Sequence, residues 1–194
     1  MPSELLKESA RKAFHLATLG YLAAYYWLPH ALVWMTAWTV FVGVFETLRL
    51  SLPGLNRALF SVFGGIAREE ESRSISGIFH TALGSTLTVA LFGGERAVVT
   101  AALLCLALAD AAAALAGKSL GRHAFILRGR KKSLEGSAAC FAVALGSTLY
   151  AGFAALPATA AALVCAVVEA APLPVNDNSV LPVATALTLH LLSR

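Results

Sequence analysis

Charged residues are scarce in this chain. Of its 194 residues only 13% are Asp, Glu, Lys or Arg, about half the share found in soluble proteins, while 58% are hydrophobic. The mean hydropathy is +0.72. So few polar side chains cannot cover the surface of a water-soluble body of this size, which excludes an ordinary soluble globule. The uncharged stretches 13–45, 75–94, 97–109 and 136–168 predict instead a helical membrane protein with several spans.

Cysteine is also rare, and several nucleotide-binding motifs are missing. Cys105, Cys140 and Cys165 each lie inside an apolar stretch without metal-site spacing, so we expect small buried apolar residues. The chain has no Gly-x4-Gly-Lys-Ser/Thr loop and no protein-kinase signature, so any nucleotide site is of another kind. No small-x-small cleavage site closes the first apolar stretch, which predicts a retained span rather than a signal peptide.

The apolar stretches divide at their Pro, Gly and His breaks into segments close to the ~20 residues that cross a bilayer. We predict one all-α membrane domain over residues 1–194 with about seven transmembrane helices, at 10–28, 31–49, 76–93, 97–117, 136–156, 158–171 and 179–193. The last two are short for a full crossing and flank the broken segment 171–178. They either border a cavity at membrane depth or are short surface helices.

Basic residues predict the orientation of these helices. With seven spans, 13 of the 15 Lys and Arg residues fall on the side of the N-terminus, and only Arg96 and Arg194 fall on the other. The positive-inside rule then puts the N-terminus in the cytoplasm, with the protein in the cytoplasmic membrane. The net charge of +4 is therefore a topology signal rather than a sign of nucleic-acid binding, and most of the available chemistry faces the cytoplasm.

Residues 53–75 do not have the character of a span. Leu55, Leu59 and Phe60 recur near helical spacing among basic residues, which predicts an amphipathic helix in the membrane interface. A charged run follows at 68–73. A solvated connector and a segment that closes over a ligand are the two alternative roles.

Asp110 is the sharpest functional candidate because an ionisable group inside a span is costly and usually functional. It lies about two helical turns from the end of its segment. Ala113, Ala114, Gly117 and Gly121 share its helical face, so a groove of small residues leads from the carboxylate to the cytoplasm. Such a groove admits a ligand or, equally, another helix.

The loop after Asp110 predicts a site for phosphate oxygens. It contains six basic residues and leads to a helix N-terminus, where cations and backbone N–H groups bind phosphate together. The alternative is a basic patch for anionic lipid headgroups. The candidate nucleotide-binding residues are Gly117, Lys118, Gly121, Arg122, Lys131, Lys132, Ser133, Glu135, Gly136 and Ser137.

Other polar residues lie near the same membrane boundary. Arg11, Lys12 and His15 share a face of the first segment, and Glu46 and Arg49 end the second. We interpret Arg49 and His80, each taken alone, as side chains that extend to the interface. Side-chain oxygens nearer the C-terminus could bind Mg²⁺ together with Asp110. An Asn-Asp-Asn run is, however, also typical of an ordinary turn. These oxygen groups belong to Glu169, Asn176, Asp177 and Asn178.

These parts suit phosphoryl transfer to a membrane lipid, and their motifs follow a familiar order. The chain resembles the CTP-dependent lipid kinase family, which includes dolichol kinase, phytol kinase and the fungal CTP-dependent diacylglycerol kinase. More distantly, it resembles the phosphatidate cytidylyltransferases. The resemblance rests on Arg11-Lys12-x-x-His15, Glu46, Asp110 through Gly117 to Arg122, Lys132-Ser133-Leu134-Glu135-Gly136-Ser137, Glu169-Ala-Ala-Pro172 and Asn176-Asp177-Asn178 with Pro182.

The resemblance implies transfer of the γ-phosphate of CTP, with a divalent metal such as Mg²⁺, to a polyprenol, a phytol-like alcohol or diacylglycerol. It puts the family's essential basic pair on Arg11 and Lys12, its aspartate on Asp110 and its CTP-binding loop on 131–137. The expected catalytic residues are Arg11, Lys12, Asp110 and Lys132. His15, Glu46, Asn176 and Asn178 support the site, and the expected metal ligands are Asp110, Asp177 and Glu169.

Two further functions fit parts of the sequence. A cytidylyltransferase acting on a lipid phosphate would release pyrophosphate, whereas the kinase releases CDP. A small transporter or lipid-binding module could use Asp110 as a proton or ion relay, and would need charge along both halves of a pathway. The outer half offers only Glu95, Arg96 and Arg194, which argues against a transporter.

Overall fold

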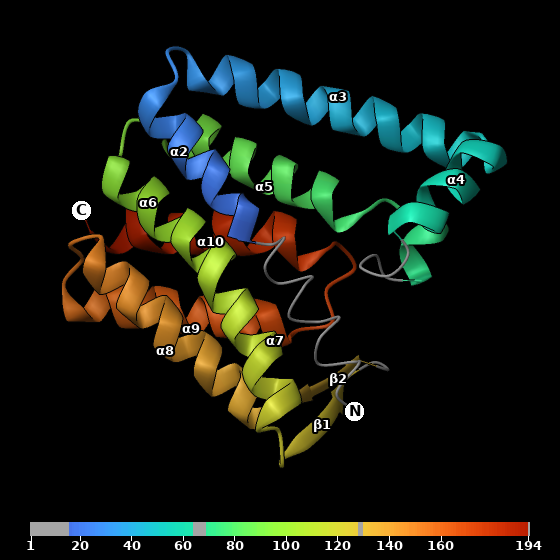
Figure 1. The fold of residues 1–194 in the computed structure, drawn as a ribbon. Coiled ribbons are helices and arrows are strands. Elements are labelled where there is room, and N and C mark those ends of the chain that lie inside the picture. Colours follow the sequence, from blue (N-terminus) through green and yellow to red (C-terminus); the bar gives the residue numbers. More distant parts are fainter. Residues whose placement is uncertain (1–15, 64–68, 128–129, 194) are drawn as a thin grey trace.

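The computed structural model describes residues 16–63, 69–127 and 130–193. Helices dominate the described chain, as predicted (Figure 1). The elements, in chain order, are η1 (Leu16–Thr18), α2 (Leu19–Trp27), α3 (Ala31–Ser51), α4 (Pro53–Phe63), η2 (Glu69–Ser72), α5 (Gly77–Phe92), α6 (Arg96–Leu104), η3 (Cys105–Ala109), α7 (Asp110–Ser119), β1 (Ala124–Leu127), β2 (Arg130–Ser133), α8 (Leu134–Tyr150), α9 (Ala155–Ala170) and α10 (Asp177–Leu192).

Each of the seven predicted segments contains a helix. Four of these helices, α3, the helix Arg96–Ser119, α9 and α10, are slightly longer than predicted, whereas α5 and α8 are shorter. The predicted span 136–156, for example, includes the turn after α8, where Gly152 has a φ of 95°. Among the described residues, two helices are both long and apolar enough to cross a bilayer, at Ala31–Ser51 and Arg96–Ser119. Gly77–Phe92 and Ala155–Ala170 are apolar but shorter. Helix length and composition therefore support two crossings, and seven remain a prediction.

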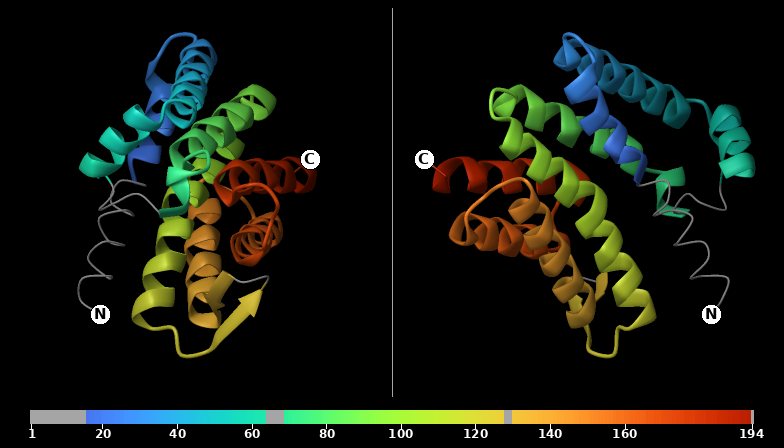
Figure 2. Two further views of the ribbon diagram at one scale, coloured as in Figure 1. Left: turned by 90° about the vertical axis from the view of Figure 1, so that its right-hand side faces the viewer. Right: turned by 60° about the vertical axis from the view of Figure 1, so that its left-hand side comes forward.

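One continuous helix, formed by α6, η3 and α7, runs through the middle of the bundle (Figures 1 and 2). On one side it packs against α8 and α10, and on the other α6 meets α2 and α5. Its buried positions are largely alanine, with Val99, Leu103 and Leu106 completely enclosed. Small side chains let neighbouring helix backbones approach closely.

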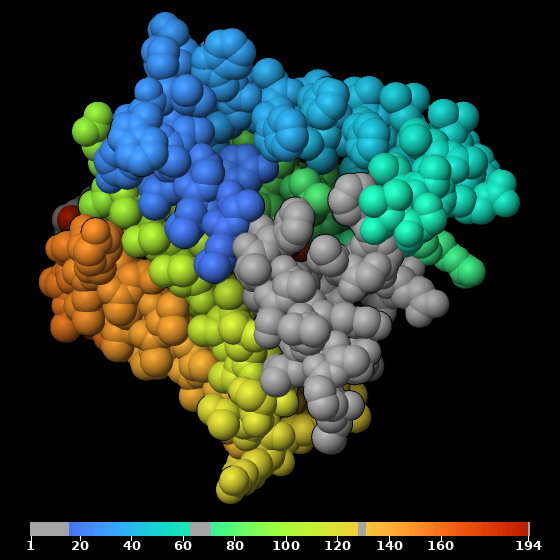
Figure 3. Space-filling model, in the orientation of Figure 1, coloured from blue at the N-terminus to red at the C-terminus, as the bar shows by residue number. Residues whose placement is uncertain are grey.

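Helix α3 lies at the edge of the bundle and packs against α5, α2 and α4. Its outer face is almost entirely apolar: Val33, Trp34, Val40, Phe41 and Val44 are each more than half exposed. Helix α3 forms much of the upper edge of the molecule in Figure 3. An exposed apolar surface of this kind is typical of contact with lipid or with another protein.

The two ends of the bundle differ (Figures 1 and 2). At the turn end lie the short turns α2–α3, α5–α6 and α8–α9 and the last turn of α10. At the loop end lie α4, η2, the two strands and the α9–α10 connection. Lys118, Arg122 and Lys132 are at the loop end and Arg96 is at the turn end, so the described part of the chain keeps the charge separation expected from the sequence.

Two features of the loop end bear on the predictions. Residues 53–63 form α4, which confirms a helix within 53–75; its position in a membrane interface remains a prediction. The all-α class holds for the fold, but the predicted loop contains a short hairpin in which β1 and β2 pair antiparallel, Ala124 opposite Ser133 and Leu127 opposite Arg130.

Candidate functional site

Asp110 follows a widened turn in the central helix. Residues Cys105–Ala109 form a π-helical segment, and Asp110 is the first residue of α7 after it. Single π-helical turns inside α-helices are uncommon and occur frequently at functional sites. Asp110 is half-buried, and it has an interaction partner. The sequence identified the aspartate but carried no clear signal for the π-helical turn.

The groove of small residues beside Asp110 receives a helix. A Cβ on Gly136 would lie 2.8 Å from the Ala113 carbonyl oxygen, and one on Gly117 would lie 3.2 Å from Ser133 Oγ. Gly121 is also close, since its Cβ would meet Ser133 Cβ at 3.1 Å. The sequence allowed either a ligand or another helix in this groove. In the structure the occupant is a helix, because α8 and its N-cap pack against α7. These glycines bring the predicted nucleotide loop against the Asp110 helix.

The predicted loop enters α8 through a regular cap. Ser133 is buried, and its Oγ accepts a hydrogen bond of 3.1 Å from the Gly136 N–H. This is the usual contact of a serine N-cap with the N3 residue. The Oγ of Ser137, one residue further, is buried without a hydrogen-bond partner among the described atoms.

Lys132 connects the hairpin to the end of α9. Its Nζ donates to a carboxylate oxygen of Glu169 and, at 2.7 Å, to the Glu169 carbonyl oxygen. Glu169 is only 5% exposed. Successive strand residues point to opposite faces, so Lys131 lies on the other face of β2, where it is exposed. Two residues predicted for different roles, a nucleotide-binding lysine and a metal-binding glutamate, therefore form one ion pair.

Glu135 is tied to the start of the hairpin. One carboxylate oxygen lies 2.7 Å from His123 Nδ1, and the His123 backbone N–H donates to both oxygens at 3.1 and 3.3 Å. Hydrogen bonds from its own N–H and from the His123 ring lower the pKa of Glu135 to about 2. The sequence offered no reason to select His123, because its partner is 12 residues away across a strand pairing.

The Asn-Asp-Asn run begins α10. Asn176 is the N-cap, and its Oδ1 accepts from the Asn178 N–H at 3.0 Å. Asp177 Oδ1 accepts from the same N–H at 3.1 Å. These hydrogen bonds are the turn chemistry that the sequence offered as the alternative to metal binding. The run also packs on α5, because a Cβ on Gly84 would lie 2.3 Å from the Asn178 carbonyl oxygen.

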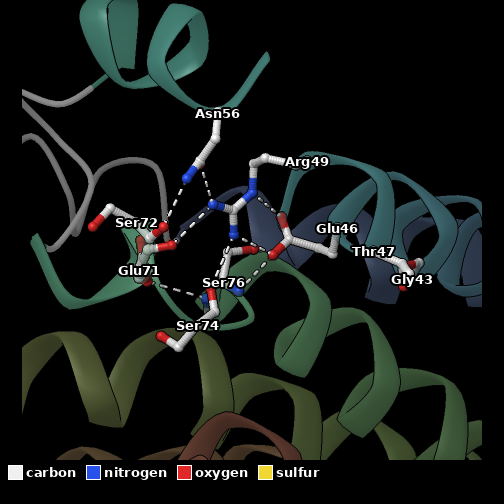
Figure 4. Close-up of polar contacts among 10 residues, drawn as sticks. Gly43, Glu46, Thr47, Arg49, Asn56, Glu71, Ser72, Ser74 and Ser76 are labelled. Carbon is white, nitrogen blue, oxygen red and sulfur yellow. Dashed lines mark hydrogen bonds and ion pairs between the residues drawn. The ribbon is translucent and has the colours of Figure 1, made fainter. Parts of the chain in front are cut away.

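Glu46 and Arg49 form a buried cluster at the end of α3 (Figure 4). Arg49 is 3% exposed, and it donates to both oxygens of Glu46, to Asn56 Oδ1 and to the carbonyls of Glu71 and Ser74 at 2.6–3.3 Å. The second Glu46 oxygen also accepts from the Ser76 N–H at 2.8 Å. Our interpretation of Arg49 as a side chain extending to the interface was wrong, because the 71–76 segment folds back over it.

His80 was also misinterpreted as a residue extending to the interface. Its Nδ1 lies 2.9 Å from Ser179 Oγ in the first turn of α10, and that hydroxyl contacts the His80 carbonyl at 3.2 Å. The charges of Asp177 and Glu46 both act on the His80 ring. His80 therefore joins the start of α5 to the start of α10 beside the Glu46–Arg49 cluster.

The predicted metal ligands divide into two neighbourhoods. Glu169 is paired with Lys132 of the hairpin, whereas Asp177 begins α10, two residues before the Ser179 that contacts His80. Within residues 16–63, 69–127 and 130–193 no three His, Cys, Asp or Glu side chains form a group suited to a metal. All three cysteines are buried free thiols, as predicted.

The remaining predicted site residues lie outside the described part of the chain or on its surface. Arg11, Lys12 and His15 lie outside the described residues. Lys118, Arg122 and Lys131 are exposed at the loop end, where a soluble anion can reach them. Lys118 has an interaction partner of its own.

Comparisons with known proteins add no assignment. No family model matches the chain, and no curated protein or solved structure is significantly similar to it.

Proposed function

We propose that the protein is an integral membrane kinase that transfers the γ-phosphate of CTP to a lipid alcohol at the cytoplasmic face. One observation carries the proposal. Three motifs that are distant in sequence meet at the loop end: Gly117 of the Asp110 helix packs on the 133–136 turn, and Lys132 binds Glu169. The family resemblance supplies the identity of the nucleotide, which the contacts alone do not specify.

The membrane arrangement is part of the proposal. The apolar outer face of α3, the membrane-length helix Arg96–Ser119 and the separation of basic residues between the two ends all support a bundle that crosses the bilayer. In this arrangement the other five apolar helices also cross, with the loop end in the cytoplasm. The acceptor then reaches the site from the membrane and the nucleotide reaches it from the water.

The chain supplies the parts that phosphoryl transfer needs. In the proposed site the exposed cations Arg122 and Lys131, with Arg11 and Lys12, bind the triphosphate. The oxygen of the acceptor hydroxyl bonds to the γ-phosphorus, and the bond between that phosphorus and the CDP oxygen breaks. Asp110 accepts the proton that the hydroxyl loses. A bound Mg²⁺ would neutralise charge on the transferring group. Asp177 lies in the other neighbourhood and Glu169 is paired with Lys132, so a Mg²⁺ beside Asp110 would take most of its ligands from phosphate and water.

Glu169 is better suited to position Lys132 than to bind the metal. Its carboxylate is buried and already paired with the Lys132 ammonium, and a second hydrogen bond fixes the same nitrogen on the α9 carbonyl. Two of the three N–H donors of Lys132 are thus used in hydrogen bonds to Glu169. The remaining donor is available to a phosphate oxygen.

The test is a transfer assay with the purified protein in lipid nanodiscs. The protein is incubated with γ-labelled CTP or ATP against diacylglycerol, phytol, geranylgeraniol and undecaprenol, and both lipid and nucleotide products are separated. The expected products are labelled lipid phosphate and CDP. A cytidylyltransferase would instead release pyrophosphate and leave CMP on a lipid phosphate. No labelled lipid from either nucleotide with any acceptor overturns the kinase proposal.

A further inference from the structure

A groove with an apolar lining runs along the outer side of the bundle between α3 and α5. Its volume is about 460 Å³, within the range of small-molecule sites. Thr39, Val40, Val44 and Thr47 line it on α3, and Phe79 lines it on α5. Gly43 makes room for the ring of Phe79, because a Cβ there would lie 2.9 Å from Phe79 Cε2.

The groove offers little to a ligand that needs hydrogen bonds. Thr39 Oγ1 donates to the Met35 carbonyl at 2.9 Å and lies 2.8 Å from Thr86 Oγ1. Thr47 Oγ1 donates to the Gly43 carbonyl at 2.9 Å. Both hydroxyls are therefore engaged within the protein, and the remaining wall is hydrocarbon. Such a lining selects an apolar chain.

One end of the groove reaches the loop end. On α3, Gly43 lies three residues before Glu46 and Thr47 follows Glu46 directly, beside the Glu46–Arg49 cluster (Figure 4). All five N–H donors of the Arg49 guanidinium are used within that cluster, so it forms a fixed polar boundary without a free donor. A chain in the groove meets charge at this end and hydrocarbon along the rest of its length.

The other wall leads to the candidate site. Phe79 precedes His80, and their rings are in contact with centroids 5.7 Å apart. His80 in turn contacts Ser179, directly after the Asn-Asp-Asn run. The wall of the groove is thus continuous with residues that the resemblance places around the phosphate-transfer site.

We infer that the α3–α5 groove binds the hydrocarbon chain of a long-chain lipid alcohol, with its hydroxyl toward the loop end. The lined part of α3, from Thr39 to Leu48, is about 14 Å long at the rise of an α-helix, so it holds one chain lengthwise. The identity of this alcohol as the phosphate acceptor rests on the proposed function. Chain binding itself does not depend on CTP.

The first test is photolabelling in nanodiscs with octadecanol that carries a diazirine in mid-chain, followed by peptide mass spectrometry. We expect adducts on Val40, Val44 and Phe79 that unlabelled octadecanol removes by competition. Adducts spread equally over Val33 and Trp34, which face outward from the same helix, and not removed by competition would show ordinary surrounding lipid and overturn the inference.

A matched pair of variants sharpens the test. Val44→Trp fills the groove, while Phe41→Trp enlarges an aromatic side chain at a position outside it; the two residues are 54% and 59% exposed. We expect Val44→Trp to lower groove labelling at least fivefold and to raise the KM for long-chain acceptors without changing kcat. Phe41→Trp should change neither. Equal melting temperatures for the two variants would exclude a folding defect as the cause.

The outcomes separate the two proposals. Competed labelling of the groove without any CTP turnover overturns the kinase proposal and supports the chain site. Turnover with Val44→Trp indistinguishable from Phe41→Trp overturns the chain site and leaves the kinase.

Discussion

The loop end and the turn end of the bundle each carry glutamate, histidine and arginine, but they use these residues differently. At the loop end Arg49 and Glu169 are buried and bind charged partners. At the turn end Arg96 is exposed and lies over the ring of Tyr26, and Glu95 contacts His190 at 2.5 Å near the surface. Burial of charge is costly unless every group is paired. The comparison indicates that buried, paired charges are found at the loop end, where we propose the phosphoryl transfer.

The largest expected effect comes from breaking the buried cluster at the loop end. Arg49→Met leaves the Glu46 carboxylate buried without its cation, and removes the links from α3 to α4 and to the 71–76 segment. Removal of one partner of a buried ion pair costs about 3–5 kcal/mol. Arg96→Met at the turn end removes one exposed cation–π contact, which contributes about 0.5–1 kcal/mol.

Both arginine variants can be compared by chemical unfolding in the same detergent. Similar losses of unfolding free energy from the two variants would contradict the distinction between the ends.

The second prediction concerns the proposed reaction. Asp110→Asn retains the size of the side chain but removes its charge and most of its basicity. Loss of a positioned general base lowers kcat by about 10²–10⁴. Glu95→Gln is the matched control at the turn end, where the proposed chemistry does not occur. Label transfer from γ-labelled CTP measures both variants, and normal turnover of Asp110→Asn would remove Asp110 from the mechanism.

The third prediction compares two glycines of α8. Gly136→Ala, near the loop end, places a Cβ 2.8 Å from the Ala113 carbonyl and forces α7 and α8 apart. Overpacking of this kind costs about 1–3 kcal/mol. Gly146→Ala, further along the same helix, meets nothing within 4 Å, so it should gain about 0.5–1 kcal/mol from helix propensity. Melting temperatures in detergent should move in opposite directions, and a shift in the same direction for both would argue against the close packing.

The sequence predicted the helices because their signals are local. Apolar stretches, together with breaks such as Leu28-Pro29-His30 and Gly93-Gly94, place the end of α2, the start of α3, the end of α5 and the start of α6 within a few residues of those observed. The turn chemistry of the Asn-Asp-Asn run was predictable for the same reason, since the hydrogen-bond partner of Asn176 is two residues away. Helix length was overestimated where an apolar stretch continues through a turn, as after Tyr150.

The predictions that failed or stayed open depend on tertiary contacts. The hairpin was missed because its strands lack an alternating apolar pattern, and the run Arg130-Lys131-Lys132 was taken as a loop. Burial of Arg49 depends on Glu71 and Ser74, more than 20 residues away. The pairing of Lys132 with Glu169 spans 37 residues. Sequence patterns selected both of these residues, but no local pattern states which partner each one has.

The smallest expected effect concerns Glu135 and its pH dependence. The pKa of Glu135 is lowered from 4.5 to about 2 by its own N–H and by His123, so its ionised form stabilises the folded state. This contribution is complete above about pH 4.5 and is lost as the pH falls toward 2. The melting temperature of Glu135→Gln should therefore lie slightly below that of the unmodified protein at pH 6 and approach it as the pH is lowered through this range. In a His123→Asn background the difference at pH 6 should shrink, because only the backbone donors remain. A difference that is unchanged between pH 6 and pH 2.5 would show that the carboxylate charge does not hold the hairpin.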